Sequence, residues 1–329
     1  MLSINHRIPL WPPKFFNAKE KNGEGTYGAV YLVSAFDGQL TYAIKRNYIG
    51  KNTSFIGSTK ELDILTRLKN HPFIVNLVSI TLDCPIINNY ICTGPSSQHR
   101  VDDLHFVFDQ AAYNGRTLIY GGTTACAYLK LAMCQLLLGL EYMHAKGIVH
   151  CDIKPDNLLW FRYGEHRMIK ICDFGLSKYH SKQEEGNDKC ATPWYRAPEI
   201  IFGNKYYDEK IDIWSIGCVF FEMIAKRALM DASNGLSKHV DEPPPFVLAS
   251  RILSITPELP TRELIDSLNG NNSIPFDALL YNQKRPTWRD LIGLSSQAIA
   301  NFNSDAYGNY EQFLDLLAKC LRINPKMRI

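Results

Sequence analysis

The stretch His150-Cys151-Asp152-Ile153-Lys154-Pro155-Asp156-Asn157 carries the most information in this chain. It brings together a carboxylate that can act as a base, a lysine that can neutralise a phosphate and an amide that can bind a metal ion. Downstream, Asp173-Phe174-Gly175 adds a second metal-binding carboxylate; upstream lie a glycine-rich segment at residues 23–30 and Lys45. Each element alone is a weak signal. In this order they indicate one site in which phosphate, metal and base meet.

Length and composition are those of an ordinary globular protein. The 329 residues suffice for two lobes with buried cores, and 46% apolar with 21% charged residues is a usual balance. A formal net charge of +3 is too small to indicate nucleic acid or a membrane surface as the main partner. The sequence lacks both an apolar run of about 18 residues and the apolar core of a signal peptide. We therefore expect an intracellular protein of the cytoplasm or nucleus, or of a host cell if the source is viral.

The nine cysteines show neither Cys-x-x-Cys spacing nor a Cys/His cluster that would hold zinc. In a reducing compartment they are expected to be mostly free thiols. Cys134 and Cys218 fall within apolar helical patterns, which predicts that both are small core residues. Cys172 directly precedes Asp173 and is expected to be a buried, unreactive thiol.

The order of strand and helix patterns predicts a β-rich first lobe. Residues 1–14 are irregular, whereas residues 15–48 alternate with period two and predict three antiparallel strands. Ser58-Thr59-Lys60-Glu61 has the pattern of a capping box that opens a helix, and His71-Pro72 would end it. Two further strands are expected near 73–81 and 104–110.

The second part of the chain is predicted to be helical. Residues 82–103 form an irregular insertion between two strands. Long apolar patterns predict helices at about 124–146 and 210–225, while residues 230–245 and 266–300 are expected to be loops and short helices. The chain therefore belongs to the α+β class, with a small antiparallel sheet and one helix in an N-lobe that joins a mainly α-helical C-lobe near residues 109–113.

The glycine-rich segment and Lys45 form a candidate phosphate site. Gly23-Glu24-Gly25-Thr26-Tyr27-Gly28-Ala29-Val30 fits G-x-G-x-x-G-x-V, in which the glycines let backbone amides approach phosphate oxygens. Lys45 on a following strand would hold the α- and β-phosphates and needs a carboxylate to orient it. Glu61 is the first candidate; Asp63 is the fallback, on a different face of the helix.

These motifs resemble those of eukaryotic protein kinases, and the resemblance covers roughly residues 15–329. Ala197-Pro198-Glu199 matches the end of the activation segment, and Asp212-Ile213-Trp214-Ser215-Ile216-Gly217 the central C-lobe helix. Arg328 matches the arginine that pairs with Glu199. The resemblance implies a bilobal fold with an N-lobe at about 15–110, a C-lobe at about 111–329 and an insertion at about 228–300. The chain ends one residue after Arg328, so either the C-lobe is short or the sequence is incomplete.

The resemblance also implies a serine/threonine kinase that uses ATP and Mg²⁺. Asp152 would orient the substrate hydroxyl, Lys154 would neutralise the γ-phosphate, and Asn157 and Asp173 would hold metal ions. His150 is expected to be structural. The nucleotide would be bound by Gly23, Glu24, Gly25, Gly28, Val30, Ala43, Lys45, Phe108, Asp109, Ala111 and Asp173.

Within the family the chain looks like the group of cyclin-dependent, MAP and glycogen-synthase kinases. Trp194-Tyr195-Arg196-Ala197-Pro198-Glu199 and Phe106-Val107-Phe108-Asp109 carry this likeness, with Phe108 as gatekeeper and the backbone of Asp109 and Ala111 holding adenine. A replication-initiation kinase is the less favoured subgroup. Arg196 and the stretch Cys190-Ala191 would shape the pocket for the residue after the target hydroxyl, which implies a preference for proline.

Cys151 departs from the family pattern. Most regulated kinases have an arginine there, which grips a phosphothreonine of the activation segment; dual-specificity tyrosine-regulated kinases resemble this chain in having cysteine. The position of that phosphothreonine is Asn187, which cannot be phosphorylated. We therefore expect activity without phosphorylation of this segment. Without that arginine, the phosphate-binding cluster would consist of Lys60 and Lys178. Glu184 or Glu185 could pair with Lys178.

Two other classes of function compete with the enzyme. A pseudokinase that serves as a scaffold or allosteric binder would need a broken catalytic set, yet Lys45, Asp152, Asn157 and Asp173 are present. A kinase-fold enzyme for small molecules would not need the intact Ala197-Pro198-Glu199 segment. The expected partners are ATP and protein substrates with serine or threonine, without nucleic acid or membrane. A regulatory partner such as a cyclin is not predicted, since the capping box explains Ser58–Glu61 without one.

Overall fold

The computed structural model divides the chain into two compact units. The first contains Met1–Tyr113 and Leu159–Gly175, and the second contains Asn114–Leu158 and Leu176–Ile329. The structure describes residues 11, 16–25, 28–35, 38, 40–47, 55–82, 104–121, 126–180, 190–230, 244–258, 260–268, 274, 285–304 and 308–329. The insertion predicted at 82–103 and the residues Glu184, Glu185 and Asn187 lie outside this part, apart from Leu82.

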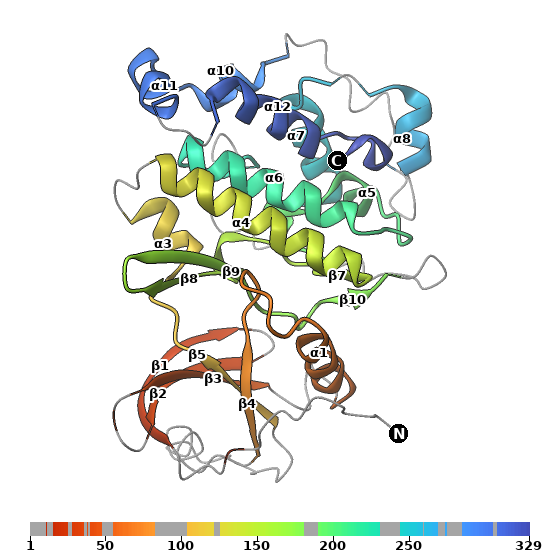
Figure 1. Ribbon diagram of the computed structural model, residues 1–329. Helices are drawn as coiled ribbons and strands as arrows, with labels where there is room; N and C mark the ends of the chain where they lie inside the picture. Colours follow the sequence, from red (N-terminus) through yellow and green to blue (C-terminus); the bar gives the residue numbers. More distant parts are fainter. Residues whose placement is uncertain are drawn as a thin grey trace. The chain divides into compact units, whose positions relative to one another are not determined.

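A five-stranded antiparallel sheet forms the first unit (Figure 1). Its order is β1-β2-β3-β5-β4, and its strands are β1 (Phe16–Gly25), β2 (Gly28–Ala35), β3 (Thr41–Asn47), β4 (Leu77–Leu82) and β5 (Leu104–Asp109). All five strands predicted from the sequence are confirmed. In β3 the alternation buries Tyr42 and Ile44 in an apolar cluster and turns Ala43 and Lys45 to the other face.

Helix α1 (Phe55–Arg67) belongs to the same unit, but the predicted start at Ser58 is wrong. The helix begins at Phe55, so the expected capping box lies inside it. Ser58 is buried on the same stripe as Glu61, Ile64, Leu65 and Leu68. Packing of this stripe, rather than local capping, determines where the helix lies. Helix α1 ends before His71-Pro72, as expected, and Asn70 takes the left-handed conformation with a φ of 71°.

The segment that follows the catalytic stretch returns to the first unit. Strands β8 (Leu158–Tyr163) and β9 (His166–Ile171) form a sheet of order β6-β8-β9 with β6 (Tyr113–Asn114). The amide of Val75 donates to the carbonyl of Ile171 at 2.9 Å, and the amide of Ile171 donates to Phe73 at 2.9 Å. These bonds fix the segment that ends at Asp173.

The second unit is mainly helical (Figure 1). The predicted long helices are confirmed as α4 (Cys126–Ala145) and α6 (Lys210–Ala225), and α6 is buried from Ile211 to Ile224. Among the residues described, no helix is long and apolar enough to cross a membrane. The other helices are α3 (Gly115–Tyr120), α5 (Pro198–Ile201), α7 (Pro245–Ile255), α8 (Arg262–Leu268), α10 (Trp288–Ile292), α11 (Ser296–Phe302) and α12 (Tyr310–Cys320), with short 3-10 turns η2 (Pro155–Asn157), η3 (Pro193–Tyr195) and η4 (Pro325–Met327).

Close packing around α6 depends on Gly217. A Cβ atom there would lie 2.9 Å from the Cβ of Cys320 and 2.9 Å from a methyl carbon of Leu321, closer than carbon atoms normally approach. The absence of a side chain thus lets the end of α12 lie directly against the buried helix.

The seven described cysteines are all free thiols. Cys218 is buried on α6 as expected, but the prediction that Cys134 is a core residue is wrong, because it is exposed on α4. The buried face of α4 is formed by residues such as Met133 and Leu136, and Cys134 falls between them in sequence but on the opposite side of the helix. Cys172 is partly exposed rather than buried.

Candidate active site

In the first unit Lys45 lies between two carboxylates. Its Nζ is 2.6 Å from Oε1 of Glu61 and 2.6 Å from Oδ1 of Asp173. Burial alone would lower the pKa of Lys45, but the two negative charges overcome it and raise the pKa above its ordinary value. Lys45 is therefore a fixed positive charge that can face phosphate oxygens.

The choice between Glu61 and Asp63 follows from the phase of α1. Glu61 is on the buried stripe of the helix and is only 4% exposed. Asp63 points to another face and forms an ion pair with Arg67, one helical turn on, at 3.1 Å. The first of the two candidates is thus the one that meets Lys45.

The other residues expected at the nucleotide lie on the sheet of the same unit. Val30 is opposite Lys45 in the register of β2 and β3, and Ala43 is opposite Phe108 in the register of β3 and β5. The rings of Phe106 and Phe108 meet edge to face with centroids 6.4 Å apart.

Two backbone features frame these strands. Gly25 and Gly28 pair across the ends of β1 and β2, which places Gly23, Glu24, Gly25 and Gly28 at that end of the sheet; the structure does not describe the Glu24 side chain. Past Asp109 and Ala111, the amide of Ala112 donates to the carbonyl of Trp160 at 2.8 Å. That bond anchors the segment at which adenine is expected.

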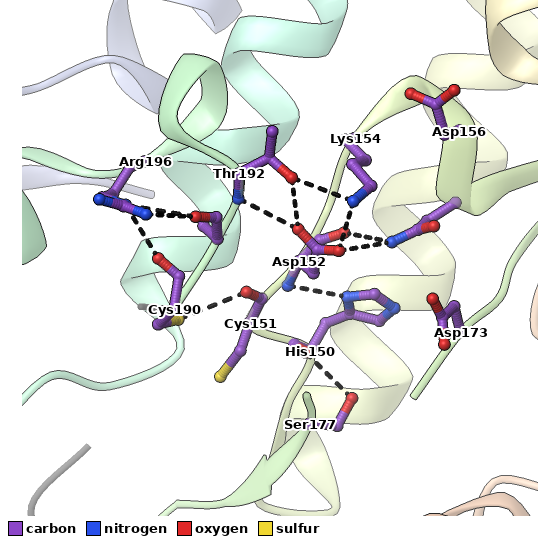
Figure 2. A network of polar contacts seen from close by, with 12 residues as sticks. His150, Cys151, Asp152, Lys154, Asp156, Asp173, Ser177, Cys190, Thr192 and Arg196 are labelled. Atoms are coloured by element: carbon purple, nitrogen blue, oxygen red, sulfur yellow. Dashed lines mark hydrogen bonds and ion pairs between the residues drawn. The ribbon is translucent and has the colours of Figure 1, made fainter. Parts of the chain in front are cut away.

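In the second unit Asp152 is the centre of a hydrogen-bonded cluster (Figure 2). Its Oδ1 accepts hydrogen bonds from the amide and the hydroxyl of Thr192, at 3.1 and 3.0 Å. Its Oδ2 lies 3.0 Å from Nδ2 of Asn157 and 2.7 Å from Nζ of Lys154. Lys154 also donates to Oγ1 of Thr192 at 3.0 Å. Together these contacts hold Asp152, a residue that is only 6% exposed.

Asn157 and Asp173 have the chemistry that a magnesium ion requires. The amide nitrogen of Asn157 donates to Oδ2 and to the carbonyl of Asp152, so its amide oxygen is the atom it can offer a cation. Asp173 has a 40% exposed side chain, accessible to a cation. No group of three or more His, Cys, Asp and Glu among the described residues could hold a metal by itself.

Sequence comparison decides the family. The chain matches the protein kinase domain over residues 16–329. It belongs to the protein kinase family. It is 31% identical to cyclin-dependent kinase D-1 of Arabidopsis thaliana over 229 residues, 67% of this chain and 51% of that protein. It is 29% identical to cyclin-dependent kinase E-1 of the same plant over 338 aligned residues, 98% of this chain and 65% of that protein. The chain thus spans half to two thirds of the length of these relatives.

The fold and the resemblance to the cyclin-dependent kinase group are therefore established for this kinase. The bilobal α+β fold predicted from the sequence is confirmed. The two relatives carry cyclin dependence in their names.

The loop at His150–Asp152, which matches the catalytic loop of the family, is anchored by Asp212 of α6, a contact that the sequence did not reveal. Asp212 is fully buried and accepts hydrogen bonds from the amides of His150 and Cys151, at 2.7 and 3.0 Å. Nε2 of His144 lies 3.0 Å from its Oδ2. The available signal was a carboxylate in the first turn of an otherwise apolar helix. His150 accepts a hydrogen bond from the amide of Asp152 at 3.2 Å, which fits a structural role.

Cys151 joins the catalytic loop to the far end of the activation segment. It is buried with a φ of 68°, and its carbonyl accepts from the amide of Ala191 at 2.8 Å and from the thiol of Cys190 at 3.4 Å (Figure 2). A hydrogen bond with Cys190, together with burial, raises the pKa of the Cys151 thiol well above its usual value. Cys151 is therefore a neutral packing residue.

The near end of the activation segment is held by a strand pair and by two side-chain contacts. β10 (Lys178–Tyr179) pairs with β7 (Ile148–Val149). Nζ of Lys178 lies 3.7 Å from the ring centroid of Tyr207 and donates to its carbonyl at 3.4 Å. Nδ1 of His180 is 3.0 Å from Oε2 of Glu209. Lys60 lies in the other unit, exposed on α1.

Two further polar clusters near the catalytic loop were not predicted. Arg116 of α3 forms a bidentate pair with Asp156, both bonds at 3.0 Å, and lowers the pKa of that carboxyl against the effect of burial. Glu222 of α6 accepts from the hydroxyls of Tyr120 and Tyr195, the latter at 2.8 Å. Burial first, and then Glu222, raises the pKa of Tyr195.

Proposed function

We propose that this chain transfers the γ-phosphate of ATP, with Mg²⁺, to serine and threonine residues of proteins. The arrangement around Asp152 carries the proposal. Four donors hold the two carboxylate oxygens, so this candidate base is oriented and buried beside Lys154. ATP supplies the phosphoryl group; the protein needs to position the hydroxyl and compensate charge, which Asp152 and Lys154 can do.

Residues of the first unit would bind the nucleotide. Lys45, oriented by Glu61, would face the α- and β-phosphates, and Asp173 would hold magnesium together with phosphate oxygens. The other proposed magnesium ligand, Asn157, belongs to the second unit. Val30, Ala43 and the backbone at Asp109 and Ala111 would enclose adenine, bounded by Phe108. The side chains present fit an ATP–magnesium complex.

The experiment is phosphate transfer from labelled ATP with Mg²⁺, using the purified chain after phosphatase treatment. Peptides that differ only in carrying serine, threonine or tyrosine serve as substrates. We expect label on serine and threonine, none on tyrosine, and none without Mg²⁺.

Activity after phosphatase treatment is expected because Lys178 already contacts Tyr207, and the loop carries Cys151 instead of a phosphate-binding arginine. An inert phosphatase-treated protein that an upstream kinase reactivates would refute independence from phosphorylation. Absence of both transfer and ATP binding would favour a scaffold.

We propose in addition that proline is preferred after the target residue. Ala191 has a φ of 64°, and its carbonyl accepts from Nε and an Nη of Arg196, at 3.2 and 3.0 Å. A substrate amide at this place would therefore find the carbonyl already bonded and would lose its hydrogen bond to water. Proline has no amide hydrogen to lose.

This argument predicts that a Ser-Pro peptide has a kcat/KM about tenfold higher than the matched Ser-Ala peptide, the effect of one unsatisfied donor. The measurement is initial rate against peptide concentration for the pair. A Ser-Gly peptide is the control for backbone flexibility and should behave like Ser-Ala. Equal values for Ser-Pro and Ser-Ala would exclude proline direction.

A further inference from the structure

Glu61 accepts a second hydrogen bond, and its donor has no assigned role. While Oε1 of Glu61 meets Lys45 at 2.6 Å, Oε2 accepts from Nδ2 of Asn47 at 3.3 Å. Asn47 lies two residues after Lys45 on β3, so both donors project from the same face of that strand. The carboxylate is thus held at both oxygens by one strand.

The second donor matters because Lys45 is shared. The same ammonium group is 2.6 Å from Asp173, so that carboxylate competes with Glu61 for a single positive charge. Asn47 and Glu61 are only 2% and 4% exposed, so water is a poor substitute for either partner. A buried carboxylate that loses a donor is destabilised, because water cannot replace the lost hydrogen bond as it does at the surface. Asn47 gives Glu61 a bond for which no other described carboxylate competes.

The position of Asn47 also ties this bond to the glycine-rich turn. In the register of the sheet, Asn47 is the partner of Gly28, the first residue of β2. One residue therefore connects the strand that carries Lys45, the end of the glycine-rich turn and helix α1.

We infer that Asn47 is a positioning residue of the nucleotide site, which keeps Glu61 turned toward Lys45 while Lys45 also meets Asp173. This inference rests on the proposed function, because the Lys45–Glu61 pair is assigned there to phosphate binding. Asn47 touches neither the nucleotide nor the substrate in this role; it acts through Glu61.

The test measures the affinity of Mg-ATP for Asn47→Leu by calorimetry, together with the KM for ATP. Leucine keeps the size and removes the donor, so affinity should fall about tenfold, as for one hydrogen bond to a charged group. Asn47→Asp has the same shape but places a second negative charge beside Glu61, so its loss of Mg-ATP affinity should be larger than that of Asn47→Leu. The matched control is Ser79→Ala, which removes a buried hydroxyl hydrogen-bonded to the Ile80 carbonyl elsewhere in the sheet. It should lower Tm without changing affinity.

A double-mutant cycle separates positioning from general stability. In the Glu61→Gln background, Asn47→Leu should change affinity by less than about twofold, because the group on which it acts is already altered. A full effect in that background, or an unchanged affinity in the single variant, would overturn the inference. A wild-type chain that binds Mg-ATP but transfers no phosphate would refute the proposed function, and the role of Asn47 would still be read from affinity.

Discussion

Replacing Asp152 with asparagine is expected to lower phosphate transfer by about 10² to 10⁴-fold, the range for loss of a positioned base. The two oxygens of Asp152 accept from Thr192, Asn157 and Lys154, so the carboxylate is already oriented before a substrate arrives. An amide keeps one acceptor but turns a nitrogen toward donors and can no longer take a proton.

Three measurements make this result interpretable. Initial rates under saturating ATP report the chemical step, Mg-ATP affinity should be unchanged, and the melting curve shows whether the variant folds. The matched control is Asp156→Asn, in the same loop, whose exposed pair with Arg116 predicts a change of less than about fivefold. If Asp152→Asn retained more than a tenth of the wild-type rate, Asp152 would not be the base.

The second large effect is on stability and concerns Arg328. Its guanidinium forms two bonds of 2.6 Å to the carboxylate of Glu199, and it also donates to the carbonyls of Arg322 and Ile323. The two side chains are 0% and 3% exposed. Arg328→Met should lower the free energy of unfolding by about 3–5 kcal/mol, because it leaves Glu199 as an unpaired buried charge.

Denaturant unfolding of Arg328→Met, of a double variant and of a control variant tests this expectation. Arg289→Met removes an exposed partner of Glu311 and should cost less than about 1 kcal/mol. The double variant Glu199→Met with Arg328→Met should recover part of the loss, since it removes the unpaired charge. A single Arg328 variant as stable as the Arg289 variant would contradict the assignment.

Local patterns in the sequence predicted most of the fold and the pairing of Lys45 with Glu61. Period two identified the strands that carry Lys45 and Phe108, and the helical phase favoured Glu61 over Asp63, because these are properties of neighbouring residues. The predictions that α1 starts at Ser58 and that Cys134 is buried were wrong, because both depend on which face of a helix packs against the rest of its unit.

Contacts between distant residues could not be predicted in the same way. Asp212 lies 61 residues beyond Cys151 of the loop it anchors, and Lys178 meets Tyr207 across 29 residues. Asn47 and Glu61 are closer, but nothing periodic relates the end of a strand to the middle of a helix. Such pairs follow from how the elements pack, and packing is a property of the whole unit.

The bonds of Asp212 have a consequence for genetics. The amides of the catalytic loop are attached to the most buried helix of the second unit, so the loop follows any small shift of α6. Conditional alleles that map to α6 should therefore show a catalytic phenotype at temperatures where the protein is still abundant. A screen for temperature-sensitive loss of function would therefore recover substitutions at buried positions of α6 as readily as substitutions at the candidate catalytic residues.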